Sequence, residues 1–250
     1  MKIRMLAALS AVLLAHTATA QESPLRVVAS NGVKAVIEDL RPKMLGTLPR
    51  TPTFDFNSTT GLRQKIDAGE TFDVAILTVE GVDDLIKAGK IEAGTRTVFA
   101  RSGIGVGVRM GARKPDIRTP EALKQTLLRA KSITYAEDGA SRAYIVKMLD
   151  RFGIRAEIER KTTLEQGSTR AATRVADGRT EIVMTLVSEI LPAPGVQLVG
   201  PFPEEVQSYV TFAAGIAVNS KNAEAGRALI RFLKSPEVAP TLKAKGMDPR

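Results

Sequence analysis

Four short polar turns carry the side chains in this sequence that are best suited to chemistry. They cover residues 30–32, 57–61, 137–141 and 165–169, and each stands between a strand-like apolar stretch and a stretch with helical spacing. Hydroxyl and amide side chains at such turns, together with the free N–H groups of the following helix, bind anions. One such turn alone is more often an ordinary helix cap, but the four together predict a site for a small anion.

The residue types that are missing exclude several kinds of catalysis. The sequence has no Cys, and its one His is His16. Ser-His-Asp and Cys-His nucleophile systems, disulfides and ordinary zinc sites are therefore excluded. We expect neither a cofactor nor a metal, so any catalysis must use Asp, Glu, Lys, Tyr or hydroxyl groups.

The first twenty residues have the three parts of a secretory signal. Lys2 and Arg4 form a basic start, residues 5–15 form an apolar stretch too short to span a bilayer, and residues 18–20 read Ala-Thr-Ala. We expect cleavage after Ala20 and a periplasmic mature protein. No Cys follows the signal, which argues against a lipid anchor.

The mature chain is basic without the pattern of a nucleic-acid-binding protein. Removal of residues 1–20 from the 250 leaves 230, and loss of Lys2 and Arg4 lowers the formal charge from +9 to +7. The basic residues are scattered, and aromatic residues make up only 4% of the sequence, so no stacking platform is visible. We therefore expect no nucleic acid partner. A small anionic ligand and a merely solvated basic surface both remain compatible with this charge.

Strand and helix patterns alternate along the chain, which predicts an α/β fold with parallel sheets covered by helices. Strands are expected at residues 26–29, 53–56, 73–77, 133–136, 156–160 and 182–186. Helices are expected at residues 33–45, 62–68, 82–88, 142–152, 170–176 and 222–233, with further helix starts at Thr119 and Ser235.

Two long extended stretches, residues 97–109 and 210–218, separate two α/β units. This order predicts two lobes joined by a two-stranded hinge, with a ligand in the cleft between them. The first lobe is expected to comprise residues 21–101 plus 204–250, and the second residues 102–203. The polar turns then face the cleft, because open α/β sheets bind ligands at the carboxyl ends of their strands.

Several phrases of the sequence are typical of one known family. They are residues 28–31 (Val-Ala-Ser-Asn), 58–62 (Ser-Thr-Thr-Gly-Leu), 73–76 (Asp-Val-Ala-Ile) and 229–237 (Leu-Ile-Arg-Phe-Leu-Lys-Ser-Pro-Glu). With them, the mature chain resembles the periplasmic molybdate-binding protein family, the substrate-binding components of ABC importers. The resemblance implies a type II periplasmic binding protein fold, a small anionic ligand and a membrane permease as partner. We expect a monomer.

The resemblance also implies which residues contact the anion. The family's oxyanion contacts fall on Ser30, Asn31, Thr59, Thr60, Ser141 and Ser168. The tyrosine that donates a hydroxyl in the family falls on Leu186, and the Ser-Asp pair after it falls on Ser188 and Glu189.

Three departures from the family pattern change the expected ligand. The hydroxyl donor is lost at Leu186, and Arg142 and Arg170 replace small residues in the third turn and after the fourth. Because arginine forks match planar carboxylates, these changes favour a di- or tricarboxylate over a tetrahedral oxyanion. The alternative is that both arginines point out of the cleft and pair with acids such as Asp138 or Glu165.

Two functions remain open from the sequence. The first is a binding protein that captures the anion for import without any chemistry. The second is an enzyme on the same fold, because the chain is also similar to periplasmic aconitate isomerase, which shifts a proton along an allylic system. In that case Arg142 and Arg170 hold carboxylates, and Asp138, Glu189 or Tyr209 moves the proton.

Overall fold

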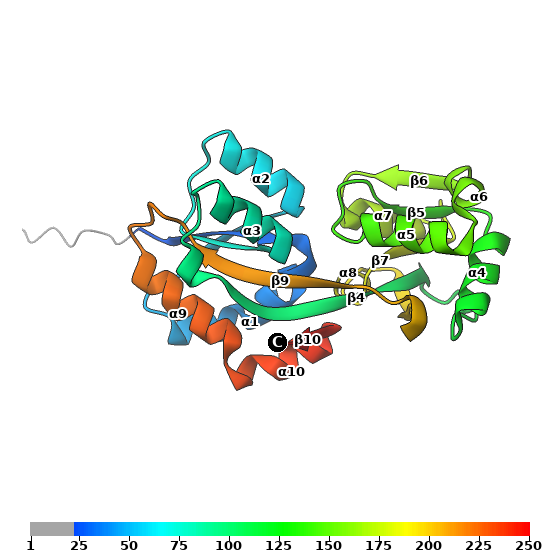
Figure 1. Cartoon of the computed structure of the whole chain (residues 1–250). Helices are drawn as coiled ribbons and strands as arrows, with labels where there is room; N and C mark the ends of the chain where they lie inside the picture. The colour runs from blue at the N-terminus through cyan, green and yellow to red at the C-terminus, as the bar shows by residue number, and fades with distance from the viewer. Residues whose placement is uncertain (1–22) are drawn as a thin grey trace, which may run out of the picture.

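The structure is a computed structural model that describes residues 23–250. The signal peptide expected at residues 1–20 lies outside the described residues. Within them, ten strands form one sheet: eight follow a continuous path in the order β2-β1-β3-β9-β4-β7-β5-β6, and β8 and β10 lie off this path and both pair with β4. Figure 1 shows that this path divides into two lobes, with β4 and β9 running between them.

The first lobe is built on three parallel strands, to which antiparallel strands are added. Parallel β1 (Leu25–Ser30), β2 (Pro52–Asn57) and β3 (Val74–Thr78) are joined by antiparallel β9 (Tyr209–Ile216), the first part of β4 (Thr97–Arg109) and β10 (Met247–Pro249). One face carries α1 (Lys34–Thr47), α9 (Ala223–Lys234) and α10 (Ala239–Ala244), and the other carries α2 (Thr59–Asp67) and α3 (Val79–Lys87). Short 3₁₀ turns are η1 (Asn31–Val33), η2 (Ala93–Thr95) and η4 (Pro236–Val238).

The second lobe repeats this plan on a smaller scale. Parallel β5 (Ile133–Ala136), β6 (Thr162–Glu165) and β7 (Ile182–Leu186) are joined by the second part of β4 and by β8 (Val196–Pro201). The helices are α4 (Pro120–Arg129), α5 (Arg142–Phe152), α6 (Arg155–Glu159), α7 (Ser168–Ala176) and α8 (Val187–Ile190), and η3 (Glu204–Val206) leads back to the first lobe.

Strand β4 belongs to both lobes because it changes partners half-way along its length. Residues 97–103 pair with β9, and residues 104–108 pair with β7. At the change, the side chain of Gln207 bonds both backbone groups of Ile104: the Ile104 N–H donates to Oε1 at 2.9 Å, and Nε2 donates to the Ile104 carbonyl at 3.0 Å. The amide of Gln207 thus bonds to β4 at the point where its pairing changes, and Ile104 also pairs with Leu186 of β7.

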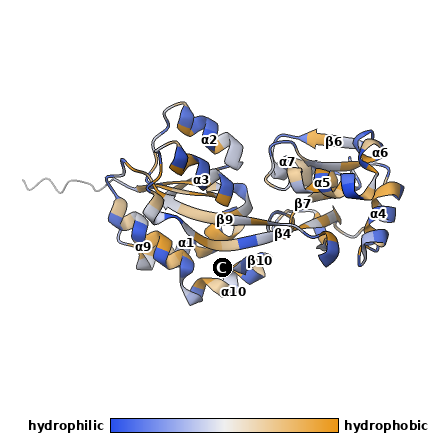
Figure 2. Ribbon diagram, in the orientation of Figure 1, coloured by the Kyte–Doolittle hydropathy of each residue, from blue (hydrophilic) through white to orange (hydrophobic). Residues whose placement is uncertain are grey.

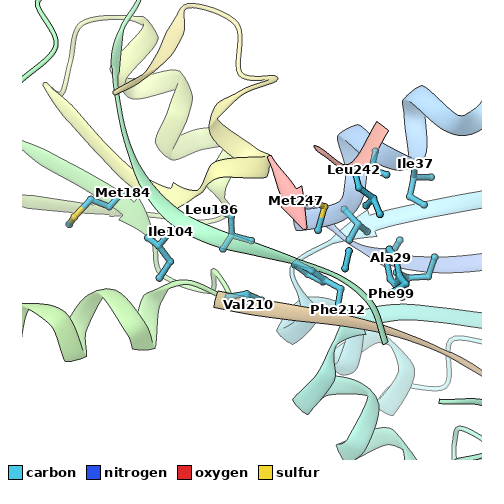
Figure 3. Close-up of a cluster of buried hydrophobic side chains, with 14 of the residues drawn as sticks. Ala29, Ile37, Phe99, Ile104, Met184, Leu186, Val210, Phe212, Leu242 and Met247 are labelled. Atoms are coloured by element: carbon cyan, nitrogen blue, oxygen red, sulfur yellow. The ribbon is translucent and has the colours of Figure 1, made fainter. Parts of the chain in front are cut away.

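One large cluster of buried apolar side chains extends through both lobes, and a smaller cluster lies in each lobe. Figure 3 shows the large cluster running from Met184 in the second lobe, past Leu186 and Val210, to Phe212 and Phe99 in the first. The helices that cover the sheets each carry both apolar and polar residues, as the colours of Figure 2 show. No helix among the described residues has both the length and the apolar character needed to cross a membrane.

The predicted α/β alternation is confirmed, and the strands at 133–136 and 182–186 and the helix at 142–152 have the expected bounds. The strand predicted at residues 156–160 is wrong, because this segment is helix α6. Its two buried side chains, Ile154 and Ile158, are four residues apart, and Arg155 pairs with Glu159 at 2.7 Å one turn later. The fifth expected strand is instead β6, directly before the fourth polar turn. Strands β8 and β10 were not predicted.

Phe212 lies on the hinge strand β9 and packs beneath Gly32, just after β1, so its truncation tests the shared core. We expect Phe212→Ala to lower the free energy of unfolding by about 3–5 kcal/mol, because it removes a fully buried ring and leaves a cavity. Urea unfolding measures this change. Val218→Ala, at a site that is 48% exposed, should change it by less than about 0.5 kcal/mol. An equal effect of the two substitutions would contradict this description of the core.

Candidate functional site

Strand pairing brings the four polar turns together in two pairs. Ser30 and Asn57, at the ends of β1 and β2, are direct partners in the parallel register, so the first two turns are neighbours. Ala136 and Glu165 are partners at the ends of β5 and β6, so the third and fourth turns are neighbours as well. Each lobe therefore presents two polar turns at the carboxyl edge of its sheet.

The first turn is shaped by close packing beneath it. Ser30 is buried, and its Oγ accepts a hydrogen bond from the Gly32 N–H at 3.4 Å. A Cβ on Gly32 would overlap the ring of Phe212 and lie 3.0 Å from Leu186 Cδ1, so glycine is required here. Asn31 is left half-buried at the start of η1. Leu186, where the resemblance places a tyrosine hydroxyl, is an apolar support under this turn.

The second turn uses most of its hydroxyl groups for local capping. Ser58 Oγ accepts from the Gly61 N–H at 3.0 Å and caps α2. Thr59 Oγ1 accepts from the Thr78 N–H at 3.4 Å, which ties the start of α2 to the end of β3. Thr60 is exposed.

The third and fourth turns are held together by backbone and carboxylate bonds. Asp138 Oδ1 accepts from the Gly167 N–H at 2.8 Å, and the Glu137 N–H donates to the Glu165 carbonyl at 2.8 Å. Asp138 thus fixes the start of α7. Ser141 is buried at the start of α5.

The two arginines expected as carboxylate clamps differ in their surroundings. Arg142 Nη1 donates to the carbonyl of Glu137, in its own turn, at 3.1 Å. Arg170 is exposed on α7, and its side chain has no hydrogen-bond or ion-pair partner among the described residues. Neither arginine pairs with Asp138 or Glu165; Glu165 instead accepts from Arg174 at 3.0 Å.

A cavity of about 210 Å³ lies between the two lobes, at the start of α1 on one side and at α7 and α8 on the other. Three of the predicted residues line it: Asn31, Ser168 and Glu189. The predicted residues that do not line it are Ser30, Thr59, Thr60, Asp138, Ser141, Arg142, Arg170 and Tyr209. The other lining residues are Lys34, Ala35, Glu38, Thr169, Ala172, Thr173, Ser188, Pro192, Ala193 and Pro194. We call this space the interlobe pocket.

Glu189 places a largely buried carboxyl group at the interlobe pocket. Its Oε1 accepts from Ser168 Oγ at 2.8 Å, and its Oε2 accepts from the hydroxyl of Thr185. Burial raises the pKa of Glu189 above its ordinary value of 4.5, and the charge of Asp138 raises it further. The bonds from Thr185 and Ser168 act in the opposite direction, because they favour the ionised form. A carboxyl with a raised pKa in a pocket can hold or transfer a proton near neutral pH.

Lys34 is a pocket residue that the sequence reading missed. It is the first residue of α1, three positions after Asn31, and its Nζ lies 3.7 Å from Glu38 Oε1 and 5.8 Å from the centre of the Phe56 ring. Its side chain is 48% exposed, so it can reach a ligand. The sequence signal that could have identified Lys34 was its place one helical turn after Asn31.

Tyr144 on α5 was also missed. Burial raises the pKa of Tyr144, and so does the negative charge of Glu80. Because Glu80 lies in the first turn of α3, Tyr144 faces the other lobe. Tyr209, the tyrosine that was predicted, is 41% exposed and stacks under Arg101, whose guanidinium lies 3.8 Å from the ring centre.

Comparison with known proteins identifies related sequences over nearly the whole chain. A family model described as "Bacterial extracellular solute-binding protein" matches residues 25–248. An aconitate isomerase from a Pseudomonas species is 29% identical over 252 residues, which cover 97% of this chain and 95% of that protein.

Solved structures show the same fold at low sequence identity. The periplasmic molybdate-binding protein of Azotobacter vinelandii has a TM-score of 0.75 at 14% identity, covering 89% of this chain and 98% of that one. L-phospholactate-bound PEB3, a protein of Campylobacter jejuni, has a TM-score of 0.69 at 14% identity, covering 90% and 100%. The predicted fold class is thus confirmed.

The raised pKa of Glu189 predicts a pH-dependent contribution to stability. The folded protein holds this proton more tightly than the unfolded chain, so the contribution is present below a pH of about 4.5 and is lost as the pH rises through the raised pKa. We expect Glu189→Gln to gain stability relative to the wild type as the pH rises from about 4.5 to about 8.

Urea unfolding at several pH values measures this difference. Glu38→Gln is the matched control, because Glu38 is a half-exposed carboxyl on the same pocket. Parallel pH profiles for the wild type and Glu189→Gln would contradict the prediction.

Proposed function

Because this chain belongs to the bacterial extracellular solute-binding protein family, we propose that it captures a small anion, preferably a di- or tricarboxylate, between its two lobes. The observation that carries this proposal is the interlobe pocket. There, an amide (Asn31) and a cation (Lys34) of the first lobe face a hydroxyl (Ser168) of the second. Amide, hydroxyl and ammonium groups are the donors that anion sites use.

The preference for a carboxylate rests on what surrounds these donors. Leu186 supplies no hydroxyl at the place where the resemblance expects one, so a tetrahedral oxyanion loses a donor. Lys34 adds a positive charge that a neutral-donor oxyanion site does not need. The relative named aconitate isomerase and the PEB3 structure with bound L-phospholactate support a carboxylate-bearing ligand on this fold.

We propose lobe closure as the mechanism of capture, with lobes at residues 21–101 plus 204–250 and at residues 102–203. Arg142 and Arg170 are proposed as further carboxylate contacts in the closed state, and Ser30, Thr59, Thr60 and Ser141 as further donors. A hinge of two strands permits such a motion.

The setting of the protein follows from its family. We propose export to the periplasm with cleavage after Ala20, action as a monomer, and delivery of the anion to the membrane permease of an ABC importer. No nucleic acid or cofactor takes part in this proposal.

A second function is favoured by Glu189. A carboxyl with a raised pKa beside an anion pocket is suited to act as a general base, and one base is enough for an allylic proton shift. The base removes a proton from the CH₂ group of cis-aconitate, the double bond moves by one carbon, and a proton returns at the other end to give trans-aconitate. Asp138 and Tyr209 are the other proposed bases, although Asp138 holds the Gly167 N–H and Tyr209 stacks with Arg101.

Incubation with cis-aconitate distinguishes the two functions, with trans-aconitate followed by chromatography. A binding protein binds the anion and leaves it unchanged. An isomerase forms trans-aconitate, and Glu189→Gln abolishes this activity if Glu189 is the base.

We expect citrate or trans-aconitate to stabilise the protein more than sulfate or molybdate in a thermal-shift screen. An anion at about a hundred times its Kd adds about 2.7 kcal/mol to the free energy of unfolding. Lys34→Ala should weaken binding by about tenfold, because it removes a charged hydrogen-bond donor.

Calorimetry of matched variants checks this expectation. Lys87→Ala is the control, since Lys87 is 79% exposed at the far end of α3 and should not change the affinity. Arg142→Ala and Arg170→Ala test the clamps directly. Submicromolar molybdate binding without carboxylate binding would overturn the ligand preference.

A further inference from the structure

The hydroxyl of Ser168 has one proton, and it uses this proton in a hydrogen bond to the carboxylate of Glu189. Ser168 Oγ donates to Glu189 Oε1 at 2.8 Å, and Thr185, which is fully buried, donates to the other carboxyl oxygen. An ionised carboxylate can only accept hydrogen bonds, so both hydroxyl protons are committed to it. Ser168 therefore cannot donate to an anion while Glu189 is ionised.

The charges around the interlobe pocket also oppose the binding of an anion while Glu189 is ionised. Its charged lining residues are Lys34 and Glu38 on α1 and Glu189 on α8. Lys34 and Glu38 are 3.7 Å apart and offset each other, so an ionised Glu189 leaves the lining net negative.

The elements packed around Glu189 do not remove this negative charge. Asp138, on the turn beside α7, adds a further negative charge near Glu189. In the pocket, α7 contributes only uncharged groups, and β4 and the C-terminal turn contribute Ser102 and Gly246 against α8. An ionised Glu189 therefore opposes the binding of an anion among these lining groups, and a neutral Glu189 does not.

We propose that the interlobe pocket binds its anion together with one proton, which Glu189 takes up from the solvent. This inference rests on the proposed anion-binding function. The proton attaches to a carboxyl oxygen of Glu189, which then donates to Ser168 Oγ. The Ser168 hydroxyl turns and offers its own proton to the anion. No other bond forms or breaks.

Burial already favours the neutral form of Glu189 before an anion arrives, and the charge of the anion favours it further. Uptake of one proton per anion makes the affinity rise as the pH falls, by at most about tenfold per pH unit above the pKa of Glu189. The proton is thus a second ligand of the same pocket.

Calorimetry in two buffers with different ionisation enthalpies tests the proposal, from about pH 5 to about pH 8. The probes are trans-aconitate and sulfate, and sulfate stays fully ionised over this range. We expect a binding enthalpy that depends on the buffer and corresponds to as much as one proton taken up per anion.

Three variants separate the parts of the mechanism. In Glu189→Gln, the amide can donate to Ser168 and accept from Thr185, as the protonated acid does. This variant should bind at about pH 8 at least as tightly as the wild type, with no proton uptake. Ser168→Ala should lose about tenfold in affinity. Glu224→Gln, at a carboxyl that is 86% exposed and lies outside the pocket, should keep the proton uptake.

The outcomes distinguish this inference from the proposed function. If trans-aconitate binds with the same heat in both buffers, and Glu189→Gln has the pH dependence of the wild type, the proton coupling is overturned and anion binding stands. If sulfate binds with proton uptake and trans-aconitate does not bind, the coupling stands and the carboxylate preference falls. If neither anion binds at millimolar concentration, both proposals are overturned.

Discussion

The hydrogen bonds of Ser188 join the parts of the molecule on which the interlobe pocket depends. Ser188 Oγ donates to the Gly32 carbonyl at 2.8 Å, and its N–H donates to Ser102 Oγ at 3.2 Å. Ser102 Oγ in turn donates to the Gly246 carbonyl at 3.1 Å. These bonds link the first polar turn, the shared strand β4, the start of α8 and the C-terminal turn. Because both serines are buried, loss of one bond leaves polar groups without water, which makes the arrangement costly to break.

The apolar layer beneath this network explains both the shape and the electrostatics of the pocket. Leu186 and Phe212 pack against Gly32, so the first turn rests on hydrocarbon. Glu189 follows three residues after Leu186 and shares this poorly hydrated setting. Poor hydration disfavours a charge, which is why the pKa of Glu189 rises although two hydroxyl groups bond to it. A tyrosine at position 186 would bring a hydroxyl group to this layer. With leucine there, the layer is apolar, and Glu189 is the titratable side chain next to it.

The net positive charge of the chain says little about the pocket. Arg96, Arg118 and Arg155 each pair with a nearby carboxylate on the surface, where such pairs contribute little to stability. A basic surface raises the local concentration of anions and speeds their encounter with the protein. In the proposed function, selection of one anion depends on the few groups that line the pocket, and Lys34 is the cation among them.

The sequence by itself determined the α/β alternation, the crossing strand at residues 97–109 and the polar turns, because hydrophobic period and capping residues are local properties. It also placed Asn31, Ser168 and Glu189 among the site candidates. It did not distinguish α6 from a strand, because five residues with alternating character fit both periods, and the packing of Ile154 and Ile158 decided between them. Lys34 and Tyr144 were not predicted because both lie within helices, outside the four polar turns. Which side chains share one pocket was decided by the tertiary structure, since β4 and β9 bring α1 against α7 and α8, more than 120 residues away in the chain. The competition of Glu189 and an anion for the proton of Ser168 follows from that placement alone.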